Sequence, residues 1–227
     1  MELNVKLQLN LKEWDLKKAL RLYVIPDRII GAPLSLTDQT RLALEGGATV
    51  IQLRDKEMDG GDLLTTAGEM AALCRKAGAL FIVNDRLDVA LLSGADGVHL
   101  GQSDLSVKEA RRLAPRPFIV GASAHTPEEA RRAEEDGADY LGVGAVFDTG
   151  SKGNAKVIGT KGLRAVADLA RIPLVAIGGI SEENLTEVLK CGVDGVSVIS
   201  AAVRGDVRQR TAALLKKMGE GTQKSAD

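Results

Sequence analysis

Two aspartates, Asp85 and Asp104, are the residues whose type and spacing most directly suggest chemistry. Each follows a short apolar run, Phe81–Val83 for Asp85 and Gly97–Leu100 for Asp104, and the segment between the runs is typical of a helix. Buried parallel strands joined by a crossover helix have this pattern. On neighbouring strands, the two carboxylates would lie on one rim of a sheet and could hold a hard cation such as Mg²⁺. The competing interpretation is that each Asp only caps the helix after it.

Composition narrows the class of protein. The chain has 227 residues, of which 44% are hydrophobic, enough for one or two domains with a full core. A net charge of -1 argues against a nucleic-acid or membrane-surface binder. No apolar run reaches the roughly 18 residues of a membrane span, and the first 20 residues are too charged for a signal peptide. With two cysteines, Cys74 and Cys191, in expected helix ends, we predict a cytoplasmic protein.

Eight short apolar runs predict eight strands, each followed by a segment that favours a helix. The predicted strands are Leu22–Ile25, Thr49–Leu53, Phe81–Val83, Gly97–Leu100, Phe118–Gly121, Tyr140–Val146, Leu174–Ile177 and Gly195–Ile199. Predicted helices include 36–45 capped by Ser35, 62–76, 106–113, one that starts at the capping box Thr126-Pro127-Glu128-Glu129, 161–170, 182–190 capped by Ser181, and 206–218.

Eight strand–helix units predict a single (β/α)₈ TIM barrel of the α/β class over residues 21–218. Residues 1–20 would form an N-terminal extension with a short helix over 11–20, and 219–227 a disordered tail. A Gly-Ala-(Thr/Asp) turn, or Gly-Val-Asp in its last copy, precedes four strands and ends at Thr49, Asp96, Asp139 and Asp194, as expected for repeated units. An open doubly wound sheet is the alternative, disfavoured because no dinucleotide fingerprint follows the first strand.

In a barrel of this kind, chemistry is carried out at the carboxyl ends of the strands. Polar, cationic and glycine residues gather at those predicted ends: Gln52, Arg54, Lys56, Asn84, Asp85, Gln102, Asp104, Ser123, His125, Thr149, Gly150, Ser151, Lys152, Gly178, Gly179 and Ser200. Cations and glycine amides suit phosphate groups, and three cations with two carboxylates favour a metal-bound diphosphate over a monoester.

Simpler interpretations remain for several of these residues. Arg54 or Lys56 could form an internal ion pair with Asp85. We interpret His99, which alternates with apolar neighbours, as a satisfied core histidine rather than a catalyst. His125 could be a helix cap or a base.

Seven segments, in order along residues 20–205, resemble thiamine-phosphate synthase. They are QLRDK (Gln52–Lys56), VNDR (Val83–Arg86), GVHLGQSD (Gly97–Asp104), GASAHT (Gly121–Thr126), FDTGSK (Phe147–Lys152), AIGGI (Ala176–Ile180) and GVSVIS (Gly195–Ser200). The resemblance implies a barrel transferase of thiamine biosynthesis. It would join 4-amino-2-methyl-5-(diphosphooxymethyl)pyrimidine to a thiazole phosphate, or its carboxylate, and release pyrophosphate.

The resemblance also implies roles for residues. The pyrimidine diphosphate would be held by Gln52, Leu53, Arg54, Asp55, Lys56, Asn84, Ser123 and Lys152, with Arg54, Lys56, Ser123 and Lys152 as catalytic residues. Asp85 and Asp104 would bind Mg²⁺. The thiazole phosphate would contact Thr149, Gly150, Ser151, Gly179, Ile199 and Ser200. The implied reaction is dissociative: pyrophosphate leaves, and the thiazole nitrogen captures a pyrimidinylmethyl cation.

One loop departs from the family pattern: Ala145 and Asp148 stand where prolines are frequent, and Ser151 where a threonine is frequent. Two alternatives in function stay open, a thiazole tautomerase-like relative and a non-catalytic phosphate-binding barrel. Gln52 and the Gln102…Asp104 metal pair argue against the tautomerase, because proton transfer involves no diphosphate to neutralise. The expected partners are the two substrates, with no nucleic acid and no membrane; homo-oligomer formation is left open.

Overall fold

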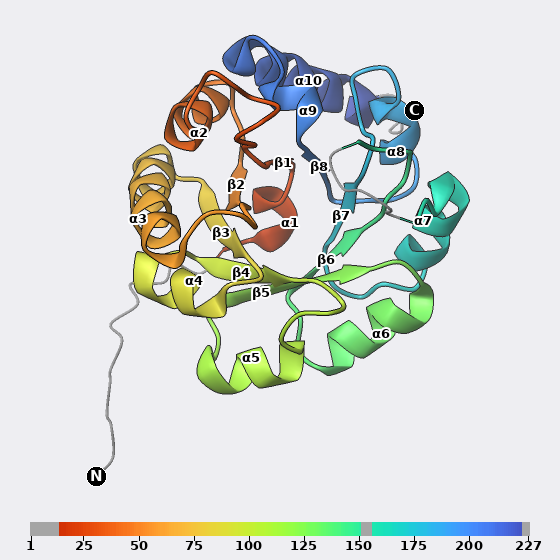
Figure 1. Ribbon diagram of the computed structural model, residues 1–227. Helices are drawn as coiled ribbons and strands as arrows, with labels where there is room; N and C mark the ends of the chain where they lie inside the picture. Colours follow the sequence, from red (N-terminus) through yellow and green to blue (C-terminus); the bar gives the residue numbers. More distant parts are fainter. Residues whose placement is uncertain (1–13, 151–155, 224–227) are drawn as a thin grey trace.

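In the computed structural model, which describes residues 14–150 and 156–223, eight parallel strands pair in chain order and close into a barrel. Helices surround the barrel, as Figure 1 shows in a view along its axis. The strands are β1 (Leu22–Val24), β2 (Val50–Leu53), β3 (Leu80–Asn84), β4 (Gly97–Leu100), β5 (Ile119–Ala124), β6 (Tyr140–Val143), β7 (Leu174–Ile177) and β8 (Gly195–Val198). This is the predicted (β/α)₈ fold.

The helical layer follows the predicted order, with two differences. Its helices are α1 (Leu16–Ala19), α2 (Leu36–Glu45), α3 (Gly60–Ala77), α4 (Leu87–Ser93), α5 (Val107–Leu113), α6 (Pro127–Glu135), α7 (Gly159–Ala167), α8 (Leu185–Leu189), α9 (Ser200–Val203) and α10 (Val207–Gln223). The short α9, directly after β8, was not predicted. α10 continues to Gln223, so the prediction of a disordered tail from residue 219 is wrong over residues 219–223; 224–227 lie outside the described residues.

Hydrogen bonds to capping side chains explain which of the predicted helix starts are found in the structure. Ser35 Oγ accepts the Asp38 N–H at 3.0 Å, and Thr126 Oγ1 accepts the Glu129 N–H at 3.2 Å. The predicted cap at Ser181 is wrong, because α8 begins only at Leu185. Asn184 precedes that helix, and its side chain instead holds the chain before it by accepting the Ser181 N–H at 2.9 Å.

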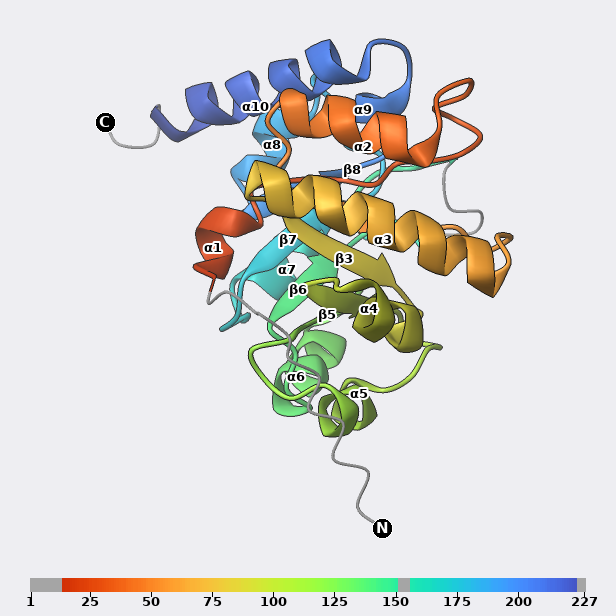
Figure 2. The same ribbon diagram turned by 90° about the vertical axis from the view of Figure 1, so that its left-hand side faces the viewer.

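The short helix α1 lies at the amino-terminal end of the barrel (Figure 2). It covers a smaller range than the predicted helix over 11–20, of which residues 11–13 lie outside the described residues. The chain then enters β1 through Leu20, which is fully buried. A Cβ on Gly195 would lie 1.8 Å from the Leu20 carbonyl oxygen, so only glycine permits this close approach at the start of β8.

The repeated turn at the amino-terminal end joins strands in pairs. The side chain of its last residue accepts a backbone N–H from the preceding strand, at 2.8–2.9 Å, and its own N–H donates to that same strand residue's carbonyl. The four pairs are Thr49 with Leu22, Asp96 with Phe81, Asp139 with Val120 and Asp194 with Leu174. Each pair links an odd-numbered strand to the even-numbered strand after it, which explains why the motif occurs four times in an eight-stranded barrel.

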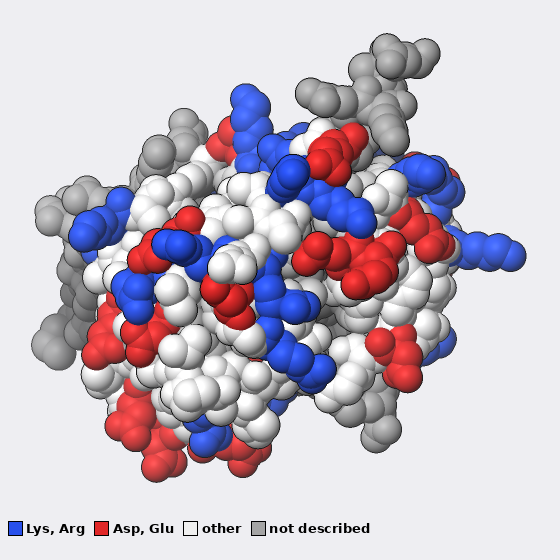
Figure 3. All heavy atoms as spheres, turned by 90° about the horizontal axis from the view of Figure 1, so that it is seen from above, with Lys and Arg blue, Asp and Glu red and all other residues white. Residues whose placement is uncertain are grey.

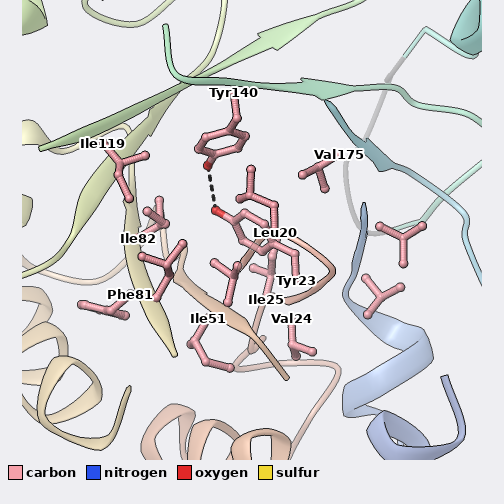
Figure 4. Close-up of a cluster of buried hydrophobic side chains, with 14 of the residues drawn as sticks. Leu20, Tyr23, Val24, Ile25, Ile51, Phe81, Ile82, Ile119, Tyr140 and Val175 are labelled. Carbon is pink, nitrogen blue, oxygen red and sulfur yellow. Dashed lines mark hydrogen bonds between the residues drawn. The ribbon is translucent and has the colours of Figure 1, made fainter. Parts of the chain in front are cut away.

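Aliphatic side chains make up most of the buried core, with few aromatic rings among them (Figure 4). Within residues 14–150 and 156–223, no helix combines the length and the apolar character needed to cross a membrane. On the face shown in Figure 3, acidic and basic side chains are interspersed, in line with the near-zero net charge.

Candidate active site

The loops at the carboxyl-terminal ends of the strands bring most of the predicted site residues to one rim. They fall into three groups: a charged cluster after β2, β3 and β4, a glycine pocket after β7 and β8, and a cavity inside the barrel between them. Because β3 and β7 are four strands apart in a closed barrel of eight, the first two groups lie on opposite sides of the opening.

The charged cluster contains the two aspartates in contact. The Asp104 carboxyl group lies beside that of Asp85, and Lys56 Nζ lies 3.1 Å from Asp85 Oδ2. Burial, with the neighbouring Asp104, raises the pKa of Asp85. Asp104 Oδ2 also accepts the Gly101 N–H at 2.7 Å. The helix-cap interpretation is not supported for Asp104, because Ser106 caps α5.

The backbone of Asp85 has φ of +61°, which no other non-glycine residue has within the described parts of the chain. A left-handed conformation at a residue with a Cβ costs about 1–2 kcal/mol. The Asp85 N–H nevertheless donates to the His99 carbonyl at 2.9 Å, so the neighbouring strand holds the residue in this conformation. The strained turn lies directly after β3, at the rim.

The two carboxylates fit a divalent cation. Their mutual contact leaves negative charge that Lys56 only partly compensates, and Mg²⁺ prefers carboxylate oxygens supplemented by water and substrate phosphates. Among residues 14–150 and 156–223, no group of three or more His, Cys, Asp or Glu side chains gathers at one point. Among the described side chains of these four types, Asp85 and Asp104 are therefore the two that a metal held here would meet.

Arg54 supplies the clearest unmet hydrogen-bonding capacity of the charged cluster. Its Nε atom is buried and has no hydrogen-bond partner among the described residues. A buried donor without a partner is costly, and an anionic ligand would satisfy it.

Two other residues of the QLRDK segment serve the fold. Asp55 Oδ2 accepts Arg28 Nε at 2.9 Å, while Asp55 Oδ1 accepts the N–H groups of Glu57 and Met58. Leu53 is buried in the core, so only its backbone could reach a ligand. Asn84 ends β3 beside His99 on β4.

The glycine pocket lies on the opposite side of the rim. It is lined by Thr149, Ile177, Gly178, Gly179, Ile180, Ser197, Val198, Ile199 and Ser200. Gly178 has φ of +101°, and a Cβ there would lie 2.6 Å from the Ala145 Cα atom. The Phe147 N–H donates to the Gly178 carbonyl at 3.0 Å. The loop after β6 is thus held against the glycine pair, which positions Thr149 at the pocket although the prolines frequent in the family are absent.

The cavity inside the barrel has a mixed lining, in which polar side chains lie among apolar ones. Its lining residues are Tyr23, Ile25, Gln52, His99, Ser123, Tyr140, Gly142, Val175, Ile177 and Ser197. His99 is buried and hydrogen-bonded, as the sequence indicated, but its Nε2 lies 3.0 Å from Ser123 Oγ. It therefore contacts a predicted site residue, which the interpretation as a plain core histidine missed.

Two tyrosines and one serine of the cavity were also missed. Tyr23 and Tyr140 were assigned only to strands. Ser197 Oγ is buried without a hydrogen-bond partner in the described part of the chain, and it lines both the cavity and the glycine pocket. Glycines in the sequence of neighbouring strands could have indicated them, because an interior strand glycine often makes room for another group. A Cβ on Gly121 would lie 2.2 Å from the Tyr140 ring, and one on Gly142 2.8 Å from the His99 ring.

Four further predicted positions are not placed in these groups. Gly150 is exposed. Ser151 and Lys152 lie outside the described residues, so their predicted roles stay predictions. His125 contacts Glu129 through both its ring Nδ1, at 2.9 Å, and its backbone N–H, at 2.7 Å, as expected for a cap at the start of α6.

A closed parallel barrel with cations, carboxylates and a glycine pocket on its carboxyl-terminal rim has the layout of a (β/α)₈-barrel enzyme. Residues 22–202 match the model of the family described as thiamine monophosphate synthase. The thiamine-phosphate synthase of Methanocella arvoryzae is 57% identical over 183 residues, covering 80% of this chain and 86% of that protein. The solved thiamine phosphate pyrophosphorylase from Pyrococcus furiosus has a TM-score of 0.85 at 46% identity, covering 91% of this chain and 99% of that one. The chain belongs to the thiamine monophosphate synthase family.

Proposed function

We propose that this chain is a thiamine-phosphate synthase that joins a pyrimidinylmethyl diphosphate to a thiazole phosphate and releases pyrophosphate. The observation that carries the proposal is the presence of two anion-suited regions on opposite sides of one rim. The charged cluster suits a diphosphate and the glycine pocket suits a monophosphate, with a cavity of mixed polar and apolar lining between them. Two phosphorylated substrates could therefore meet above the cavity.

The charged cluster would bind the leaving diphosphate. Arg54, through its partnerless buried Nε, and Lys56 would stabilise the negative charge that builds on the diphosphate as its C–O bond breaks. Asp85 and Asp104 would hold Mg²⁺, which would act as a Lewis acid on the oxygens of the leaving diphosphate. The contact between the two carboxyl groups supports this assignment.

The cavity would hold the pyrimidine ring, with Gln52 and Ser123 as hydrogen-bonding residues. Gln52 is buried and Ser123 half-buried, and both line the cavity. The ring would thus be held away from water while its diphosphate reaches the charged cluster. Because the thiazole nitrogen brings its own lone pair, the residues need only position the two partners, and no protein nucleophile is required.

The glycine pocket would take the thiazole phosphate. Gly179, Ile199 and Ser200 line it, and backbone N–H groups beside glycines can approach an anion closely. Thr149 adds a hydroxyl from the loop after β6. We assign Ser151 and Lys152 of the same loop to the substrates on the family resemblance alone.

The direct test is to incubate the purified protein with both substrate halves and Mg²⁺ and to measure thiamine phosphate and pyrophosphate. We expect both products in equal amounts, their loss with EDTA and their return with added Mg²⁺. Isomerisation of a thiazole phosphate carboxylate without coupling would instead establish the tautomerase alternative. Binding of phosphate compounds without turnover of either kind would establish the non-catalytic alternative.

A further inference from the structure

Five polar side chains form one continuous hydrogen-bonded chain across the barrel interior. Gln52 Nε2 lies 2.7 Å from the Tyr23 hydroxyl, which lies 3.1 Å from the Tyr140 hydroxyl; this last contact is the dashed line in Figure 4. The Tyr140 hydroxyl lies 3.0 Å from His99 Nδ1, and His99 Nε2 lies 3.0 Å from Ser123 Oγ. These residues come from β2, β1, β6, β4 and β5, and we call them the relay.

The direction of each hydrogen bond in the relay follows from the number of hydrogens. Burial raises the pKa of both Tyr23 and Tyr140, so each hydroxyl keeps its one hydrogen. The Gln52 Nε2 atom can only donate, so the Tyr23 oxygen accepts from it. Tyr23 must then donate its hydrogen to Tyr140, because neither hydroxyl is exposed to solvent.

The same reasoning continues to the other end of the relay. Tyr140 accepts from Tyr23 and therefore donates to His99 Nδ1. The neutral imidazole then carries its hydrogen on Nε2, which donates to Ser123 Oγ. Ser123 receives a hydrogen bond and keeps its own hydrogen for a group in the cavity.

The relay therefore makes one of its ends a hydrogen-bond acceptor and the other a hydrogen-bond donor. Gln52, with its Nε2 directed to Tyr23, presents the carbonyl oxygen Oε1 as an acceptor, and Ser123 presents a donor. Reversing every bond is the only other arrangement that satisfies all the groups, and it would turn Gln52 into a donor and Ser123 into an acceptor. Whether Gln52 donates or accepts a hydrogen bond in the cavity therefore depends on whether Ser123 accepts or donates one.

We propose that Tyr140 and Tyr23 are specificity-determining positioning residues: through His99 they make Gln52 an acceptor and Ser123 a donor, and so select a 4-aminopyrimidine over its 4-oxo analogue. An aminopyrimidine offers the matching N–H donor on its amino group and a lone pair on a ring nitrogen. The 4-oxo analogue offers an acceptor in place of the amino group and carries a ring N–H, which matches only the reversed relay. This inference rests on the proposed function.

The first measurement is of the free protein and does not depend on activity. The chain has two histidines, His99 and His125, so ¹⁵N-histidine labelling gives two rings to assign, with His125→Asn identifying the second. We expect His99 to carry its hydrogen on Nε2 in the wild-type protein and to become a mixture of tautomers in Tyr140→Phe. A hydrogen on Nδ1 of His99 in the wild-type protein would overturn the deduced direction.

The second measurement is the ratio of kcat/KM for the pyrimidine diphosphate to that for its 4-oxo analogue. The intrinsic difference in reactivity between the two compounds is the same in every variant, so a change in the ratio reports on the protein. Tyr140→Phe removes the central link and should lower the ratio by about 10-fold or more, since a site built to hydrogen-bond one group discriminates strongly against its absence. Tyr23→Phe should act in the same direction.

A matched control separates discrimination from loss of packing. Thr211 on α10 is buried and donates its hydroxyl hydrogen to the Val207 carbonyl at 2.7 Å, outside the cavity lining. Thr211→Val removes a buried hydroxyl without touching the relay, and its ratio should equal that of the wild-type protein. A wild-type ratio in Tyr140→Phe, in a protein that makes thiamine phosphate, would refute the specificity role alone. Absence of thiamine phosphate with either pyrimidine in the wild-type protein would refute the proposed function instead, while the tautomer measurement would still stand.

Discussion

At the amino-terminal end of the barrel, Asp96, Asp139 and Asp194 each accept a backbone N–H from a neighbouring strand, whereas at the carboxyl-terminal end Asp85 and Asp104 face each other. The first three carboxylates complete hydrogen bonds that the strands would otherwise lack. The last two leave negative charge that the protein itself does not balance. The same residue type thus stabilises the fold at one end and weakens it at the other.

The cations differ between the two ends in the same way. Arg111 forms an ion pair with Asp139 in which both side chains are more than 85% buried, and its remaining N–H groups donate to backbone carbonyls of Gly137, Ala114 and Phe118. Arg54 at the other end has a buried Nε with no hydrogen-bond partner in the described part of the chain. Of these two arginines, the one with a donor left without a partner among the described residues therefore lies at the carboxyl-terminal rim, where ligands bind in this fold.

The largest effect should come from neutralising the aspartates of the rim. Asp85→Asn and Asp104→Asn keep the side-chain size, and asparagine tolerates the φ of +61° at position 85. We expect kcat for thiamine phosphate formation to fall by about 100-fold or more, on the scale of losing one charge-stabilising group. Tm of the metal-free protein should stay the same or rise, because the contact between two carboxyl groups is relieved.

The control for these variants is Asp88→Asn. Asp88 lies three residues from Asp85, but its side chain is exposed and pairs with Arg86 at 2.6 Å. Its kcat should remain near the wild-type value. Normal kcat and Mg²⁺ dependence in Asp85→Asn or Asp104→Asn would remove that residue from the metal site.

The next largest effect should follow from Arg54→Met, which keeps the apolar stem and removes the guanidinium. We expect kcat/KM for the pyrimidine diphosphate to fall by about 100-fold, with Tm unchanged or raised because a buried unpaired donor is lost. Steady-state kinetics and thermal unfolding test both parts. Arg41→Met on α2, which removes an exposed arginine paired with Asp38 and Glu45, should leave the kinetics unchanged. A marked loss of stability in Arg54→Met would instead assign the guanidinium to the fold.

At the amino-terminal end of the barrel, Asp139→Asn should lower stability and leave activity unchanged. It leaves Arg111 buried without its counter-charge, so the free energy of unfolding should fall by about 2 kcal/mol or more. Activity per folded molecule should not change. Denaturant unfolding and active-site titration measure the two quantities.

Asp96→Asn is the matched variant at an equivalent turn. Burial raises the pKa of Asp96, so an uncharged amide is the better tolerated group there, and Asn can still accept the Phe81 N–H. Its stability should equal or exceed that of the wild-type protein. Equal destabilisation by Asp96→Asn and Asp139→Asn would show that the ion pair with Arg111 adds nothing to the turn.

The smallest effect should be that of Ser197→Ala, between the cavity and the glycine pocket. Removing a buried hydroxyl that has no protein partner should raise the free energy of unfolding by up to about 1 kcal/mol. If a substrate atom normally meets this hydroxyl, KM for one substrate should rise a few-fold. A loss of stability with unchanged KM would indicate that water, rather than substrate, satisfies Ser197.

The order of the elements and many of their bounds follow from the sequence. The apolar runs Gly97–Leu100 and Leu174–Ile177 are β4 and β7 with the predicted bounds, and the caps at Ser35 and Thr126 start α2 and α6 as predicted. These features depend on residues within one or two turns of each other. The strand ends follow from the same patterns, so the sequence predicts the rim residues Arg54, Lys56, Asp85 and Asp104 as a set, with Asp85 and Asp104 on one rim of the sheet.

Which strand residues face the barrel interior depends on how the strands pair in three dimensions. In a barrel, both faces of each strand are buried, so the period-two alternation that would mark an inner face is absent. Register then selects the inward residues: Gly121 pairs with His99 on one side and Tyr140 on the other, and its missing side chain leaves room for the Tyr140 ring. The relay joins residues as far apart as 23 and 140, whose contacts exist only when the sheet closes. The pairing of β4 with β5, rather than any local pattern, places the predicted core histidine beside Ser123.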